Sequence, residues 1–321
     1  MKGKQWVQTG VLLGITVLAG VMYLNQQGLR DWWRLRGYTA PQAVSALVVD
    51  VAMTDEGRHL LYVNQPQITT GTGFTDNCPA SGEKTVVLGC YLTNDNGIFI
   101  YDVTDERLNG VEQVTAAHEM LHAAYDRLSK GERERVDAML MRYYNGGLTD
   151  QRIKDTIEAY KISEPNDVVN EMHSIFGTEV ADLPDELETY YAQYFTDRSK
   201  VAGYTARYQG EFTSRQAQIA QYDAQLQTLK AQFTANQSEL KNRKAALDAQ
   251  SAQMQKLQSG GQVATYNAQV SSYNRAVSSY NTLLNTTKDL IQQYNDIVDK
   301  RNAVVLEEQQ LAQALSASAL E

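Results

Sequence analysis

The sequence lacks any long run of lysine or arginine, and its acidic residues outnumber the basic ones. It contains 29 Lys and Arg against 38 Asp and Glu, which gives a formal net charge of -9 at pH 7. Binding to nucleic acid relies on clustered basic side chains that neutralise phosphates. The composition therefore argues against a nucleic-acid partner and is otherwise uninformative about function.

Cysteine is nearly absent, since only Cys78 and Cys90 occur. They lie twelve positions apart, next to what reads as the start of a β-hairpin. This spacing allows them to close a small loop, so we expect a disulfide and, with it, an oxidising, extracytoplasmic compartment. Two buried reduced thiols are the alternative interpretation.

Charged residues are missing from residues 6–24, an apolar stretch close to the roughly 20 residues that span a bilayer. Lys2 and Lys4 precede it. A cleaved signal peptide is the alternative, but the stretch is long for one and no A-x-A cleavage site follows. We expect an uncleaved single-pass anchor in the plasma membrane, with residues 1–5 in the cytoplasm and the remainder of the chain outside.

The length of 321 residues predicts about two folded units after the anchor. Residues 25–40 read as a juxtamembrane segment, and residues 41–204 as an α+β domain with its strands early and its helices late. A short strand is expected at residues 60–63, and residues 84–92 and 98–102 predict a hairpin. Helical patterns cover residues 41–57, 111–128, 132–144, 150–162, 167–176 and 185–197.

Proline is absent from residue 205 onward, and apolar residues there recur every seven positions. Residues 205–317 therefore predict a long coiled coil. Gly260 and Gly261 interrupt it, so we expect an antiparallel helical hairpin with its turn near residues 258–261. A coiled coil between chains is the alternative, because heptads do not identify the partner strand; a protein partner or self-association is expected either way.

The strongest chemical motif is His118-Glu119-Met-Leu-His122, on the helix expected over residues 111–128. Residues four apart lie on one face of a helix, so both imidazoles can bind one metal ion. A zinc ion held in this way lowers the pKa of a bound water, and an adjacent carboxylate can take the proton. A chance match in a solvated helix is the alternative, against which the apolar flanks argue.

Zinc needs a third protein ligand, and the segment 167–176 offers Glu171 and His173. These two side chains point roughly 200° apart on a helix, so they cannot both bind one ion. Helical periodicity leaves the choice between them open.

A H-E-x-x-H motif followed tens of residues later by Asn-Glu on a second helix resembles the gluzincin branch of the zincin metallopeptidases, over residues 84–176. The resemblance implies a zincin-like metallopeptidase domain with one Zn²⁺ per chain. It implies Glu119 as the catalytic base and His118, His122 and Glu171 as ligands.

The sequence departs from thermolysin-like members of this family, which have an acidic residue four positions after the ligand Glu; here Ile175 stands there. The group that orients the first histidine must therefore come from elsewhere. Glu179 is the alternative third ligand, and His173 is a further alternative ligand or a hydrogen-bond partner near the metal. A phenol that stabilises the oxyanion has candidates in Tyr190, Tyr191 and Tyr194.

Two functions follow from these expectations. The first is a membrane-anchored, extracytoplasmic zinc metalloendopeptidase in which a peptide or protein substrate pairs with the edge of the hairpin. The second is an envelope scaffold or adaptor, in which the coiled coil does the binding and the zincin-like domain is structural or inactive.

Overall fold

The computed structural model describes residues 20, 25–78, 87–93 and 97–316. The chain divides into two compact units. The first unit comprises Met1–Glu211 with Leu311–Glu321, and the second comprises Phe212–Gln310.

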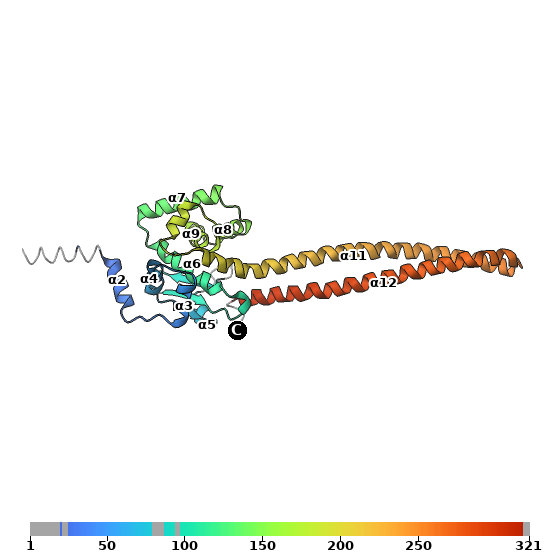
Figure 1. The fold of residues 1–321 in the computed structure, drawn as a ribbon, viewed down its shortest axis with the longest axis horizontal. Coiled ribbons are helices and arrows are strands. Elements are labelled where there is room, and N and C mark those ends of the chain that lie inside the picture. Colours follow the sequence, from blue (N-terminus) through green and yellow to red (C-terminus); the bar gives the residue numbers. More distant parts are fainter. Residues whose placement is uncertain (1–19, 21–24, 79–86, 94–96, 317–321) are drawn as a thin grey trace, which may run out of the picture. The chain divides into compact units, whose positions relative to one another are not determined.

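Helices form most of the first unit. They are α2 (Gln26–Leu35), α3 (Gln42–Asp50), α4 (Asp55–Val63), α5 (Gly71–Thr75), a 3₁₀ turn (Glu106–Leu108), α6 (Val111–Asp126), α7 (Lys130–Gly146), α8 (Gln151–Ser163), α9 (Val168–Glu179), α10 (Asp185–Tyr191) and the beginning of α11 (Ser199–Ser259). α6 lies between the sheet and α9 and packs against both (Figure 1).

A sheet of three short strands completes the first unit. The strands are β1 (Gln67–Thr69), β2 (Gly89–Leu92) and β3 (Gly97–Tyr101), in the order β1-β3-β2. β1 runs parallel to β3, and β2 runs antiparallel to it. The antiparallel pairing predicted for the hairpin is therefore present, with β2 at the edge of the sheet.

The predicted α+β class is wrong, because the described chain is mostly helical and its three strands are short. The strand expected at residues 60–63 is the last turn of α4. The side chain of Thr54 accepts a hydrogen bond from the backbone N–H of Gly57, and Asp55 and Glu56 occupy the first turn. This capping starts a helix that runs through the apolar residues, and it outweighs their preference for strands.

None of the helices within the described part of the chain has both the length and the hydropathy needed to cross a bilayer. The membrane-spanning helix that formed part of the predicted fold is therefore not found there. The segment for which it was predicted, residues 6–24, lies outside the described residues apart from Gly20.

Gly177 allows α9 to pack closely against α6. A Cβ atom at this position would lie 2.4 Å from Cδ1 of Leu121 and 2.9 Å from Cε1 of Tyr191. The sequence pattern placed a helix end at Gly177, but α9 continues to Glu179. This glycine therefore serves close packing between helices.

The second unit is formed by α11 and α12 (Val263–Ala314), which run antiparallel. Arg301 forms an ion pair with Asp223 at 2.6 Å, and the rings of Phe233 and Tyr294 meet edge to face with centroids 5.5 Å apart. The expected domain boundary at residue 205 falls inside α11, which begins at Ser199.

Candidate metal centre

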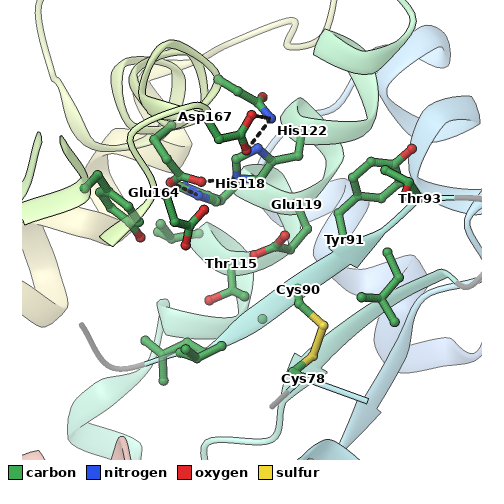
Figure 2. A pocket seen from close by; sticks show the side chains of 18 of the residues that line it. Cys78, Cys90, Tyr91, Thr93, Thr115, His118, Glu119, His122, Glu164 and Asp167 are labelled. Atoms are coloured by element: carbon green, nitrogen blue, oxygen red, sulfur yellow. Dashed lines mark hydrogen bonds and ion pairs between the residues drawn. A yellow bond between two sulfur atoms is a disulfide. The ribbon is translucent and has the colours of Figure 1, made fainter. Parts of the chain in front are cut away.

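α6 carries the candidate metal-binding motif, residues 118–122. Most of its residues are buried, because it packs against α9, the sheet and other helices, and His118, Glu119 and His122 line a cleft (Figure 2). Glu119 and His122 are buried and His118 is half-buried. The three side chains are therefore shielded from bulk water and still reach the cleft.

Glu171, on the first turn of α9, lies against both imidazoles. Its Oε1 is 3.4 Å from Nε2 of His122, and its Oε2 is 3.6 Å from Nε2 of His118. One potential ligand atom from each of the three residues lies within 4.8 Å of the others. The packing of α9 on α6 thus brings Glu171 to the two histidines, although it lies 53 positions after His118 in the sequence.

These residues fit a zinc ion. Bonds of about 2.0–2.2 Å in tetrahedral geometry separate neighbouring ligand atoms by about 3.3–3.6 Å, which matches the distances given above. Oε2 of Glu171 is buried and has no hydrogen-bond partner. A buried carboxylate oxygen without a donor is destabilising, and a bound cation would satisfy it.

The charges of the cluster shift the pKa values of its members. Burial lowers the pKa of His118, but the adjacent carboxylate of Glu171 and the charge of Glu119 outweigh burial and raise the pKa to about 9. Burial raises the pKa of Glu171, but His122 and His118 lower it further than burial raises it. The pKa of Glu119 is raised, chiefly by burial. The cluster therefore attracts positive charge strongly.

Strand β2 holds Glu119 in place. The backbone N–H of Tyr91 interacts with its carboxylate and acts to lower the pKa of that group, against the larger effect of burial. A Cβ atom on Gly89 would lie 2.9 Å from Oε1 of Glu119 and 2.4 Å from Cγ2 of Thr115. Only a residue without a side chain lets the strand approach the carboxylate this closely.

The alternative third ligands do not lie within the cluster of His118, His122 and Glu171. His173 is fully buried, and its Nε2 is 2.8 Å from the hydroxyl of Tyr190. Glu179 lines the cleft, but its carboxylate pairs with Arg152 at 2.6 Å. His59 lies 3.0 Å from Asp31. Within the described chain, none of these joins the group formed by the motif histidines and Glu171.

The three candidate phenols pack around His173 in the core. The ring centroids of Tyr190, Tyr191 and Tyr194 lie 5.5, 5.6 and 6.5 Å from that of His173. Among the described residues that line the cleft, these tyrosines do not occur. They therefore act as core aromatics in this structure.

Tyr160, which the sequence pattern did not single out, lines the cleft. Its phenol lies beside the carboxylate of Glu171 and contributes to lowering the pKa of that group. It is one of 19 tyrosines and lies on α8, outside any recognised motif. Sequence offered no signal for it, because the packing of α8 on α9 brings it to the centre.

The cleft has a volume of about 520 Å³ and is lined on one side by residues 87–93. The carbonyl of Leu88 accepts a hydrogen bond from the N–H of Tyr101 on β3. Backbone groups alternate in direction along an antiparallel pair, so those of Gly89 and Tyr91 face away from β3. The cleft therefore has a strand edge along its wall.

The predicted disulfide joins Cys78 and Cys90, with their Cα atoms 5.8 Å apart. Both residues line the cleft, as Figure 2 shows. The bond ties β2 to the segment that follows α5, so it constrains the strand that touches Glu119.

Comparisons with models of protein families, with curated proteins and with solved structures found no match. The chemistry of the centre is therefore judged from its own geometry. Two imidazoles and a carboxylate converge beside a second carboxylate in a shielded cleft. Such a set can hold a divalent cation next to a group able to accept a proton.

Proposed function

We propose that this chain is a zinc-dependent endopeptidase. The observation that carries the proposal is the convergence of His118, His122 and Glu171 within 4.8 Å, with Glu119 beside them in the same cleft. These three residues would hold Zn²⁺, which when bound lowers the pKa of a water molecule to about 7 and polarises a carbonyl group.

Glu119 acts as the general base. It takes the proton of the attacking water and passes it to the amine that leaves when the peptide bond breaks. The N–H of Tyr91 and the absence of a side chain at Gly89 keep its carboxylate in position. Tyr160, which lines the cleft beside Glu171, is our candidate for the phenol that stabilises the oxyanion.

The free edge of β2 supports a peptide as the substrate. The outward N–H and C=O of Gly89 and the C=O of Tyr91 can pair with an extended chain, and such pairing binds peptides through their backbone. The disulfide supports an oxidising compartment as the place of action.

A second candidate function is a protein-binding arm. Its support is the second unit, in which α11 and α12 extend over 61 and 52 residues and keep mostly polar side chains on their surfaces. The two functions are compatible in one protein, since the arm could present a partner or substrate to the cleft.

The substitution Glu119→Gln tests the proposal most directly. Because Gln cannot accept the proton, cleavage of an unstructured protein such as casein should fall by about 10²–10⁴-fold. Zinc content, measured by plasma mass spectrometry, should stay near one per chain. His118→Ala should lose both zinc and cleavage.

Glu134→Gln is the matched control, because it removes the same charge from an exposed position on α7. It should leave zinc and cleavage unchanged. Cleavage by the Glu119→Gln variant at the rate of the unmodified protein would exclude the mechanism.

A further inference from the structure

The cleft carries an excess of negative charge. Beyond Glu119 and Glu171, its described lining contains no lysine or arginine and four further carboxylates, those of Asp126, Glu164, Asp167 and Glu179. Arg152 compensates Glu179 from outside the lining. Two of the four, Glu164 and Asp167, lie where α8 gives way to α9.

Glu164 and Asp167 lie directly beside the metal centre. One carboxylate oxygen from each lies within 4.8 Å of the other and of an oxygen of Glu171. Glu164 is half-buried and Asp167 is exposed, and Figure 2 shows both near His118 and His122. Asp167 precedes the first residue of α9, but its side chain does not cap the helix.

Asn170 adds an acceptor that has no donor. Its Nδ2 donates to both carboxylate oxygens of Asp167, at 3.1 and 3.3 Å, which fixes the orientation of the amide. Its Oδ1 is buried without a hydrogen-bond partner, and the residue is only 8% exposed and lines the cleft. A buried acceptor in this state favours a ligand that brings N–H groups.

We propose that Glu164, Asp167 and Asn170 form a subsite for a basic side chain of the substrate, arginine foremost, next to the bond that is cut. Two carboxylates and an amide carbonyl offer acceptors only. The guanidinium group offers five N–H donors in a planar fork that matches carboxylates. The inference rests on the proposed peptidase function and adds the class of substrate.

A second metal ion fits this subsite less well. Glu171 would have to bind both ions, and the second cation would lie close to the zinc and be repelled by it. Without Glu171, only Glu164 and Asp167 remain as charged ligands, fewer than a hard divalent cation takes from a protein cage. The guanidinium group, which carries one positive charge, fits Glu164 and Asp167 better than a divalent cation does.

The test uses the full chain loaded with zinc and peptides in which one residue is either arginine or citrulline, scanned through each position. Citrulline keeps the shape of arginine but is neutral. We expect the unmodified protein to prefer arginine at one position by about tenfold in kcat/KM. The double variant Glu164→Gln/Asp167→Asn should bring this ratio close to one.

The control variant Glu134→Gln/Asp185→Asn removes the same charge from exposed positions and should keep the ratio of the unmodified protein. An unmodified protein that shows no preference, or a preference that survives in the double variant, overturns the inference. So does a metal content of two per chain that falls to one in the double variant, because the subsite would then hold a cation.

Binding separates this inference from the proposed function. Fluorescence anisotropy of labelled peptides with the Glu119→Gln chain requires no cleavage. If this binding is selective for arginine and depends on Glu164 and Asp167, while the unmodified protein cleaves no peptide, the subsite is sustained and the peptidase is rejected. Cleavage without arginine selectivity would do the reverse.

Discussion

At the scale of single residues, the centre depends on one position that has no functional group. Gly89 lies against Glu119 and Thr115, and any Cβ there would meet both side chains below 3.0 Å. The backbone N–H of Tyr91, on the same strand, also interacts with the carboxylate of Glu119. A methyl group at residue 89 must therefore move either the strand or the carboxylate.

We predict that Gly89→Ala lowers kcat at least tenfold, because a displacement of about 1 Å in a catalytic group is costly, while zinc content stays near one per chain. Adding Thr115→Ser removes the methyl group that lies 2.4 Å away. If displacement of Glu119 is the cause, kcat should recover only in part. Peptide hydrolysis and metal analysis measure the two effects.

Gly131→Ala is the control for this prediction, since a Cβ at Gly131 meets nothing within 4 Å. It should behave as the unmodified protein. Full recovery of kcat in the double variant would place the effect at Thr115 and remove Gly89 from the positioning of Glu119.

At the scale of elements, α2 is joined to the rest of the first unit by a buried carboxylate. Asp31 accepts hydrogen bonds from Arg127 at 2.7 and 2.9 Å and lies 3.0 Å from Nε2 of His59. Burial raises the pKa of Asp31, but the hydrogen bonds from Arg127 and His59 lower it further, so the net shift is downward. The ionised form thus stabilises the docking of α2.

Because the pKa of Asp31 is lower in the folded chain than in the unfolded chain, its contribution is present above the unfolded pKa of about 3.9 and is lost as the pH falls through the folded value. We predict that Asp31→Asn lowers the free energy of unfolding by about 1–3 kcal/mol at pH 7. The difference should shrink below about pH 4. Urea titrations at several pH values measure it.

Asp55→Asn serves as the comparison, because the side chain of Asp55 is 94% exposed and forms a surface ion pair with Arg58, three residues on. Such surface pairs contribute little, so its effect should be small at every pH. An Asp31→Asn deficit that stays constant down to pH 3 would show that the charge of Asp31 is not its cause.

At the scale of the whole molecule, the chain combines a unit that holds the candidate metal centre with a second unit built from two long helices. The residues that line the cleft all belong to the first unit. The two helices of the second unit are paired with each other by ion pairs and aromatic contacts. The proposed catalysis and the proposed partner binding can therefore be tested separately by deletion.

We predict that a chain lacking residues 212–310, with a flexible linker in their place, keeps about one zinc and cleaves short peptides within about threefold of the full rate, because each compact unit holds its own core. Cleavage of a folded protein substrate should fall if the arm recruits it. Loss of zinc and of short-peptide cleavage, with the deleted chain still folded by circular dichroism, would contradict this division.

Local features were predictable from the sequence. His118 and His122 are four positions apart, about one helical turn, so a helix places both imidazoles on the same side. The apolar flanks of the motif predict that this helix is packed in the core. The hairpin pairing and the disulfide between Cys78 and Cys90 were also predicted and are confirmed, because a short loop limits where its ends can go. The prediction of a strand at residues 60–63 was wrong, because the cap at Thr54 starts helix α4, which includes these residues.

The sequence by itself determined which groups can bind a metal on α6, because that depends on the geometry of a single helix. Only the tertiary structure decided which carboxylate meets them. The close packing of α9 on α6 through Gly177 turns Glu171 to the imidazoles and leaves Glu179 to Arg152. Tyr160 and Gly89 reach the cleft through contacts between elements distant in the chain, which no local pattern encodes.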